Sequence, residues 1–361
     1  MSTERTDSSS QKAAAVYNGN PRGSVYSGNS RLLIGRGARM NAVTERNKKW
    51  NFSAEWENSR TTPSAVIEQP VTSPSVVADS LSEMEKTCGY DIVKNETFEL
   101  LGEISQKKFV RQESLRTVSE ELSSRLEVTL PSTILSLINA LAPVDEYLQR
   151  HCVNVSLLNG LFGSWLGMSK REIDNLVLIG LLHDCGKALI PHRVLTAPRK
   201  LSIVEFEVIK MHASNSYDLL TEFPEPLRCA ARSHHERISG LGYPDGLSYD
   251  EIPVEARITA ISDIYDAMVS QRAYKTPRSP FNILATLNEL RDSELDARLV
   301  DVFVSHMPLE LLDKPVRLSD GSVGVIRSFD PDDPEYPVVE VNDHVTKTNE
   351  DFHCTSMYIE E

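Results

Sequence analysis

Two short clusters in the chain combine histidine and aspartate side chains in a spacing that could bind metal ions. The first reads Leu-Leu-His183-Asp184-Cys-Gly-Lys187, and the second begins with His234-His235 about fifty residues further on. Neutral imidazoles and carboxylates are ligands that suit iron, manganese, zinc and cobalt. Packing of a hydrophobic core does not require two adjacent pairs of such polar groups. The clusters therefore predict a metal centre that does chemistry.

The apolar run before the first cluster predicts how its ligands are presented. Residues 176–182 form a helical run that ends at His183, and neighbours on a helix project about 100° apart. His183 could therefore bind one metal from the side while Asp184 bridges to a second. Gly186 would let another segment approach closely. Lys187 lies one turn after His183, where its ammonium group could reach a phosphate held at the same metals.

Three more ligand candidates lie on separate helical segments. His151 precedes a helical run, and His212 lies on an apolar stripe. Asp263 is embedded in the apolar helix predicted over residues 260–268, where an unpaired carboxylate would be costly. Asp266 is expected to be a cap or a surface acid instead. His151 or His212 alone would more often be an ordinary buried histidine, so the prediction depends on the two adjacent pairs.

The remaining histidines and the cysteines show no ligand pattern. Cys185 is expected to be a small core residue, because its thiol should point away from the His183 face. Structural roles are expected for the other four histidines, which are His192, His306, His344 and His353. The five cysteines are scattered with no Cys-x-x-Cys spacing. Such an odd, dispersed set indicates free thiols in a reducing compartment.

Taken in order, these motifs resemble the signature of the HD-GYP family, a branch of the HD metal-dependent phosphohydrolases. The family's HDxGK motif is matched by His183-Asp184-x-Gly186-Lys187. Its HHE and GYP motifs are matched by His234-His235-Glu236-Arg237 and Gly240-Leu-Gly242-Tyr243-Pro244. Residues 262–267 resemble the helix that ends in the family's last metal-binding aspartate, and residues 270–275 resemble its SxRxYR segment. The resemblance covers roughly residues 135–306.

The resemblance implies an all-helical domain with two divalent metal ions, either iron or manganese. Carried over by position, the metal ligands would be His151, His183, Asp184, His212, His234, His235 and Asp263. Asp184 would bridge the two ions and, together with Lys187, would be catalytic. Members with three metals have a glutamate where this chain has Tyr147, so a two-metal site is expected.

The activity that the resemblance implies is hydrolysis of the second messenger cyclic di-GMP to the linear dinucleotide, with GMP as a further product. A hydroxide that bridges the metals would attack phosphorus, while the metals and Lys187 neutralise the developing charge. The residues expected to contact substrate are Lys187, Arg237, Gly242, Tyr243, Pro244, Arg272 and Lys275. Two alternatives stay open: a scaffold that binds a cyclic dinucleotide without hydrolysis, and an HD phosphohydrolase that acts on another nucleotide.

Composition restricts the partners of the chain. The net charge of −14 argues against binding to polymeric nucleic acid, although residues 1–62 carry ten Lys and Arg against five Asp and Glu. No apolar run approaches the roughly 18 residues of a membrane span, and the polar N-terminus lacks a secretory signal. A cytoplasmic protein is therefore expected, and the resemblance to the HD-GYP family implies a bacterial one. Beyond cyclic di-GMP, the candidate partners are diguanylate cyclases, other cyclic di-GMP signalling proteins and a second copy in a homodimer.

Four regions with a mainly α fold are predicted along the chain. Residues 1–75 are polar and rich in Ser, Thr, Asn, Arg and Gly, which predicts a disordered tail. Residues 76–130 are predicted to be helical, with Phe98 on an apolar face that packs on the domain or forms a dimer contact. Residues 131–306 are assigned to the all-helical HD-GYP domain. Residues 313–361 are predicted to be a small β-rich unit with Asp320-Gly321 as a hairpin turn.

Overall fold

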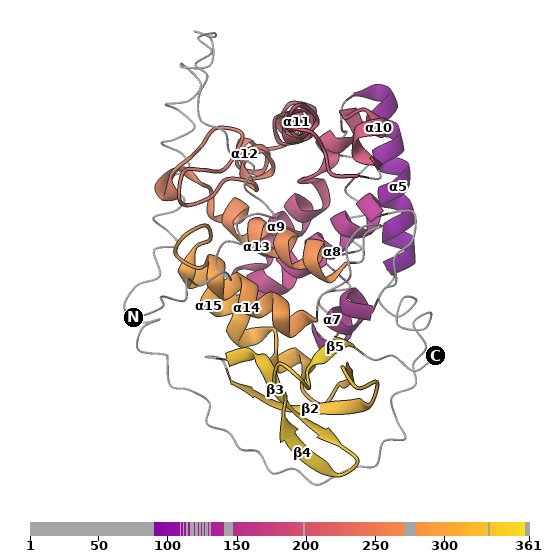
Figure 1. Cartoon of the computed structure of the whole chain (residues 1–361). Helices are drawn as coiled ribbons and strands as arrows, with labels where there is room; N and C mark the ends of the chain where they lie inside the picture. Colours follow the sequence, from indigo (N-terminus) through magenta and orange to yellow (C-terminus); the bar gives the residue numbers. More distant parts are fainter. Residues whose placement is uncertain are drawn as a thin grey trace, which may run out of the picture.

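A helical body with a small β-sheet at one end makes up the part of the chain that the structure describes (Figure 1). The computed structural model describes residues 90–108, 110, 131–140, 147–197, 199–270, 279–330 and 333–357. It also describes positions 112, 115, 119, 122, 124, 126 and 129. The predicted mainly α fold with a small C-terminal β unit is confirmed. The predicted disordered tail lies outside the described residues, and the division into four regions stays a prediction.

The helices follow one another with short connections. In chain order, the described α-helices are α5 (Tyr90–Lys107), α7 (Pro131–Ala140), α8 (Tyr147–Trp165), α9 (Lys170–Leu182), α10 (His192–Leu195), α11 (Ile203–Leu219), α12 (Glu225–Ser233), α13 (Val254–Val269), α14 (Pro280–Leu290) and α15 (Ala297–His306). Short 3-10 helices are η1 (Cys185–Leu189), η2 (Tyr249–Glu251) and η3 (Leu309–Leu311). None of the helices within the described residues is long and apolar enough to cross a membrane.

Helix α13 is the central element of the helical body (Figure 1). Every residue from Val254 to Val269 is buried, as expected for a core helix with no solvent-facing stripe. It packs against α8, α9, α12, α14 and α15. Besides Glu255 in its first turn, two acids, Asp263 and Asp266, lie within this buried helix. Because a buried carboxylate needs partners, the position of α13 already indicates that both acids are paired.

Local sequence signals define the ends of the helices that present the site. Helix α11 begins with a capping box, in which Ser202 accepts a hydrogen bond from the Glu205 N–H and the Glu205 carboxylate accepts one from the Ser202 N–H. Ser169 and Glu172 form the equivalent pair at the start of α9. These boxes fix the start of each helix and hence the rotation of the ligand-bearing residues that follow.

Helix α5 lies along one side of the helical body, in contact with α8 and η1 (Figure 1). Its buried face includes Thr97, Leu100, Leu101 and Ile104. The prediction that Phe98 belongs to this face was wrong, because its side chain is 50% exposed. Phe98 lies about 120° around the helix from Ile104, which places it outside the buried stripe.

The β unit is a five-stranded antiparallel sheet with the strand order β4-β3-β2-β1-β5. Its strands are β1 (Pro315–Leu318), β2 (Val323–Asp330), β3 (Asp333–Val341), β4 (His344–Lys347) and β5 (Cys354–Met357). The predicted turn at Asp320-Gly321 joins β1 and β2, with Gly321 at a φ of +86°. Helix α14 packs on β3 and contributes a hydrogen bond of 2.6 Å from Asn282 Nδ2 to Glu335 Oε1.

The cysteines within the described residues are free. Cys152, Cys185, Cys229 and Cys354 are all buried. This agrees with the free thiols predicted from their spacing, and Cys185 is a core residue as expected. Cys88 lies outside the described residues.

Candidate metal centre

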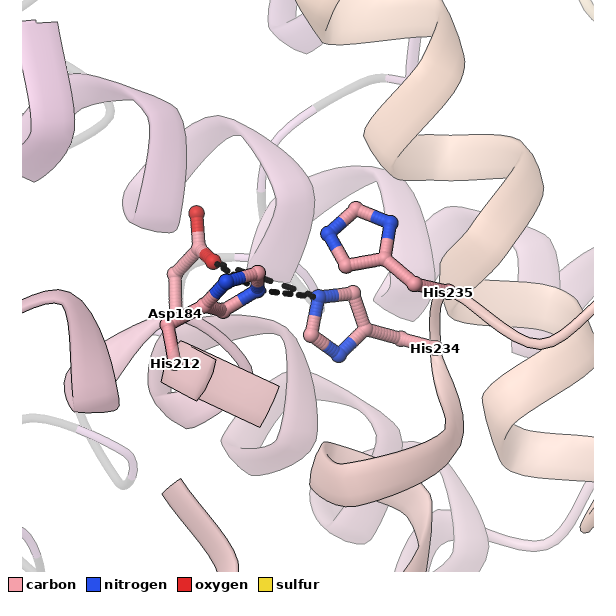
Figure 2. A group of neighbouring side chains, drawn as sticks. All are labelled: Asp184, His212, His234 and His235. Carbon is pink, nitrogen blue, oxygen red and sulfur yellow. Dashed lines mark hydrogen bonds and ion pairs between the residues drawn. The ribbon is translucent and has the colours of Figure 1, made fainter. Parts of the chain in front are cut away.

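Seven side chains of the predicted ligand set converge in the middle of the helical body. Helix α8 carries His151, α9 ends immediately before His183, and η1 begins immediately after Asp184. Helix α11 carries His212, α12 ends immediately before His234 and His235, and α13 carries Asp263. His151 was predicted to precede its helix, whereas the structure places it within α8. Figure 2 shows Asp184, His212 and the adjacent His234 and His235 brought together from three segments of the chain.

Six of the seven residues form two groups that share Asp184. In one group, ligand-type atoms of Asp184, His212, His234 and His235 all lie within 4.8 Å of one another, and in the other those of His151, His183 and Asp184 do. The two oxygens of Asp184 face different groups. Oδ2 lies 3.4 Å from His151 Nε2 and 3.5 Å from His183 Nε2. Oδ1 lies 3.2 Å from His212 Nε2 and 3.9 Å from His234 Nε2.

Asp263 closes the arrangement from the side of α13. Its Oδ1 lies 3.1 Å from His151 Nε2, and its Oδ2 lies 3.8 Å from His235 Nδ1. The carboxylate therefore touches one histidine of each group. The remaining histidines, His192, His306, His344 and His353, belong to neither ligand group among the described residues.

Hydrogen bonds fix the tautomer of four of the histidines. The Nδ1 atoms of His183, His212 and His234 lie 2.6–2.7 Å from the backbone carbonyl oxygens of Gly180, Ile209 and Ala231. The Nδ1 of His151 lies 2.7 Å from Asp266 Oδ2. Carbonyl and carboxylate oxygens only accept hydrogen bonds, so each Nδ1 carries the proton and each Nε2 presents a lone pair.

The lone pairs of these Nε2 atoms face one another. His151 and His183 have an Nε2–Nε2 distance of 3.3 Å, and His212 and His234 have one of 3.4 Å. Two acceptor nitrogens at this separation repel each other unless a cation binds to both. The buried Asp184 Oδ1 adds a further acceptor that has no hydrogen-bond donor among the described residues. This donor set and these orphaned acceptors fit divalent metal ions.

Burial keeps the imidazoles neutral. It lowers the pKa of His183, His234 and His235 below the usual value, and it lowers that of His212 to about 4. At neutral pH all four histidines are therefore in the form that binds metal.

The two carboxylates are ionised for a different reason. Burial acts to raise the pKa of Asp184, but the charge of Lys187 and the contacts with the surrounding imidazoles outweigh it and hold the pKa well below its usual range. Burial likewise opposes ionisation of Asp263, and its contacts with His151 and the neighbouring histidines lower its pKa. Neutral imidazoles and anionic carboxylates are the protonation states that a metal site requires.

The motif residues around Asp184 pack as the spacing predicted. A Cβ atom on Gly186 would lie 2.1 Å from the backbone oxygen of His212, so glycine is needed for η1 to approach α11. Lys187 Nζ donates a short hydrogen bond to Asp184 Oδ2, and its side chain is 20% exposed. A cation thus lies beside the shared carboxylate, at the edge of the cluster that solvent reaches.

Asp266 was predicted to be a cap or a surface acid, and this was wrong. Its side chain is fully buried, and it accepts hydrogen bonds from His151 Nδ1, Asn154 Nδ2 and Ser270 Oγ. It therefore orients a ligand candidate. Its sequence position contained a signal for this role, because a residue three positions after Asp263 on an apolar helix lies on nearly the same face.

The Gly-Tyr-Pro loop lies against the second histidine pair. The Tyr243 ring stacks on His235 with 4.6 Å between centroids and an interplanar angle of 28°. Glu236 accepts hydrogen bonds of 2.7, 3.1 and 3.0 Å from the N–H groups of Asp245, Gly246 and Leu247. A Cβ on Gly242 would lie 2.4 Å from the Glu236 Cα. The loop is therefore anchored by Glu236 and covers the ligand set with an aromatic ring.

A cation at this loop was missed by the sequence-based prediction. Lys210, on α11, places its Nζ 5.7 Å from the centre of the Tyr243 ring and 2.6 Å from Glu207 Oε1. The only sequence signal was its position two residues before His212. Like Lys187, it is partly exposed.

The other predicted substrate contacts include Arg237 and Pro244, which the structure describes, and two residues that it does not. Arg237 NH1 donates to the backbone oxygens of Glu236 at 2.9 Å and His234 at 3.4 Å, and Nε lies 3.9 Å from Glu294. Pro244 follows Tyr243 in a cis peptide bond. Arg272 and Lys275 lie outside the described residues.

The part of the chain that carries this site is similar to known proteins. A model of the HD domain family matches residues 135–299. The chain is 36% identical over 205 residues to the cyclic di-GMP phosphodiesterase response regulator RpfG of Xanthomonas campestris pv. campestris, a match that covers 55% of this chain and 54% of that protein. It is 30% identical over 185 residues to 3'3'-cGAMP-specific phosphodiesterase 2 of Vibrio cholerae serotype O1, covering 50% of this chain and 35% of that protein.

A solved structure supports the fold. Bd1817, an HDG"Y"P protein from Bdellovibrio bacteriovorus, aligns with a TM-score of 0.53 at 16% sequence identity, covering 65% of this chain and 75% of that one. The chain spans about half the length of the first curated relatives it matches. The chain is therefore similar to HD domain proteins over residues 135–299, and its resemblance to the HD-GYP family is confirmed by the family match and these relatives.

Proposed function

We propose that the chain is a metal-dependent phosphodiesterase that hydrolyses cyclic di-GMP to the linear dinucleotide, with GMP as a further product. One observation carries the proposal: four imidazoles with fixed tautomers and two ionised carboxylates direct acceptor atoms into one buried space. The names of the curated relatives support the substrate class. Relatives named for cyclic di-GMP and for a cyclic GMP–AMP both match, so the two substrates are compared directly in the test.

We propose two metal ions, iron or manganese, that share Asp184. One would be held by His151, His183 and Asp263, and the other by His212, His234 and His235. Bound metals would supply Lewis-acid activation of the phosphodiester and neutralise charge that develops on it. The Asp184 carboxylate is suited to sharing, because its two oxygens face different histidine pairs.

The remaining chemistry belongs to side chains at the exposed edge of the cluster. Lys187 keeps a positive charge beside Asp184, where it would stabilise negative charge on a non-bridging phosphate oxygen. Its hydrogen bond to the carboxylate also restrains the ammonium group before substrate binds.

The Gly-Tyr-Pro loop and α11 would grip the rest of the substrate. The Tyr243 face that does not stack on His235 is suited to an aromatic base, and Lys210 near the same ring is suited to the second phosphate. Contacts with substrate from Arg237, Gly242, Pro244, Arg272 and Lys275 remain predictions. Binding to diguanylate cyclases or other signalling proteins and formation of a homodimer also remain predictions.

The test is turnover by the full chain, purified without oxygen and loaded with Fe²⁺ or Mn²⁺. Cyclic di-GMP and 3'3'-cGAMP are supplied in parallel, and products are separated by chromatography. The expected result is a linear dinucleotide from cyclic di-GMP, and its loss in the double variant His183→Ala/Asp184→Ala. Preferred cleavage of the other dinucleotide would revise the substrate, and tight binding by the loaded wild type without any product would favour the scaffold.

A further inference from the structure

A buried chain of hydrogen bonds joins the N-terminal helix α5 to the ligand candidate His151. Tyr90 OH donates to Asn154 Oδ1, Asn154 Nδ2 donates to Asp266 Oδ1, and His151 Nδ1 donates to Asp266 Oδ2. Each of the three donor–acceptor distances is 2.7 Å. None of the four side chains is more than 2% exposed. The path therefore runs from the first described helix to a metal-ligand candidate without reaching solvent.

The direction of every hydrogen bond in this path is determined by the carboxylate. Asp266 can only accept, so the atom of Asn154 that faces it must be the amide nitrogen. The amide oxygen of Asn154 then faces Tyr90, whose hydroxyl must donate. The other Asp266 oxygen requires a proton on His151 Nδ1, which leaves the Nε2 lone pair directed toward the cluster.

Tyr90 lies outside the HD domain match, which begins at residue 135. Helix α5 is nevertheless packed against the two elements that carry His151 and Lys187, namely α8 and η1. Buried side chains such as Leu101 and Ile104 hold α5 against the helical body. Tyr90, the first residue of α5, then lies beside Asn154. The helix is therefore placed to act on the site through a specific polar contact in addition to apolar packing.

We infer that Tyr90 is a positioning residue for the metal centre, acting on His151 through Asn154 and Asp266. The inference rests on the proposed function, since it requires that the histidines bind metal. Without the Tyr90 hydroxyl, Asn154 loses the donor that favours its present orientation. The buried Asn154 oxygen then lacks this hydrogen bond, and a shift of Asn154 toward another donor would weaken its hydrogen bond to Asp266, the partner of His151. Helix α5 thereby controls how well one of the two metals is held.

The test compares Mn²⁺ affinity in the full-length wild type, Tyr90→Phe and Tyr217→Phe. Tyr217 is the matched control, because it is buried and its hydroxyl donates a 2.8 Å hydrogen bond to Glu225, which is not a ligand candidate. Equilibrium titration followed by electron paramagnetic resonance should show one ion bound about tenfold more weakly in Tyr90→Phe. The second ion should keep its affinity, and Tyr217→Phe should bind both ions like the wild type.

A double-mutant cycle separates the relay from general destabilisation. Asn154→Ser breaks the same path without altering α5, so the double variant Tyr90→Phe/Asn154→Ser should bind Mn²⁺ no more weakly than Asn154→Ser alone. In turnover, Tyr90→Phe should lower kcat and leave KM for the cyclic dinucleotide unchanged. Unchanged metal affinity in Tyr90→Phe, additive effects in the cycle, or equal losses in both tyrosine variants would overturn the inference. Absence of metal binding by the wild type would instead refute the proposed function.

Discussion

Three of the ligand-candidate histidines use the same local geometry. His183, His212 and His234 each direct Nδ1 to the backbone carbonyl three residues earlier, at Gly180, Ile209 and Ala231. Two of these histidines directly follow a helix, where carbonyl groups of the last turn lack intrahelical partners. Placing a histidine there satisfies a carbonyl and fixes the imidazole tautomer with one hydrogen bond. The Nε2 atom is left free for a metal without any dedicated side-chain partner.

The close packing of Gly186 leads to a prediction about stability. In Gly186→Ala, the added methyl group would meet the His212 backbone oxygen at 2.1 Å, so η1 must move away from α11. We expect a loss of about 1–3 kcal/mol in the free energy of unfolding, measured by urea denaturation, together with weaker metal binding. Gly102→Ala is the control, because a Cβ there meets nothing within 4 Å and should stabilise α5 by roughly 0.5–1 kcal/mol. Equal stability of the two variants would contradict this account of η1.

At the residue scale, the sequence predicted the candidate ligands but not the residues that orient them through hydrogen bonds. His183-Asp184 and His234-His235 were identifiable because each places two ligand-type side chains next to each other. Tyr90 and Asn154 were not, because an isolated tyrosine or asparagine has no spacing that indicates a partner 64 or 112 residues away. Asp266 was misjudged because an acid near a helix end is more often a cap or exposed than buried beneath a ligand.

The Glu236 side chain joins the two ends of the Gly-Tyr-Pro loop between α12 and α13. The Glu236 carboxylate accepts hydrogen bonds from three consecutive N–H groups, from Asp245 to Leu247. Arg232 adds a bidentate ion pair with Asp245, with distances of 2.7 and 3.0 Å. These contacts determine where Tyr243 stands relative to His235, and Glu236 makes three of them.

Replacing this carboxylate should affect substrate binding more than metal binding. Glu236→Gln puts an amide N–H₂ group where one oxygen accepts backbone hydrogen bonds, which loosens the loop and Tyr243. We expect KM for the cyclic dinucleotide to rise about tenfold, as a loss of roughly 1.4 kcal/mol in binding requires, with bound metal unchanged. Glu251→Gln is the control, because its capping box with Ser248 tolerates glutamine. A fall in metal content with unchanged KM would show that Glu236 supports the ligands instead.

Periodicity predicted most elements, and its failures have physical causes. The Asp-Gly turn and the apolar runs at residues 316–318, 323–326 and 338–341 predicted β1, β2 and β3. Strands β4 and β5 were missed because neither alternates buried and exposed residues: β4 is exposed along its whole length, and β5 is buried only at its two ends. Docking of β3 on α14 could not be predicted, since it depends on contacts such as Asn282 with Glu335 between separate regions.

At the scale of the whole molecule, burial of so many imidazoles makes the metal-free protein sensitive to acid. Burial lowers the pKa of His212 to about 4 and that of His183, His234 and His235 in the same direction. Between pH 6.5 and about 4 the unfolded chain binds protons at His212 that the folded chain does not, so protonation favours unfolding. The stability that the neutral form of His212 contributes is therefore complete above pH 6.5 and is lost as the pH falls toward 4.

We expect the free energy of unfolding of the metal-free protein to fall by about 1.4 kcal/mol per pH unit for each such histidine. Urea denaturation at several pH values between 7 and 4.5 measures the slope. Asp184 and Asp263, whose pKa values lie below their usual range, should not contribute within this interval. His212→Gln should reduce the slope, whereas His344→Gln, at an exposed position, should not. A metal-free protein whose stability is independent of pH in this range would contradict the assigned neutral imidazoles.

The central claim is that His151, His183, Asp184, His212, His234, His235 and Asp263 hold two metal ions. Its most direct test is metal analysis of the full chain after equilibration with Mn²⁺ or Fe²⁺ without oxygen and removal of unbound ions. The account predicts two ions per chain in the wild type and almost none in His183→Ala/Asp184→Ala. A wild-type chain that retains no metal, or a double variant that retains as much as the wild type, would contradict it.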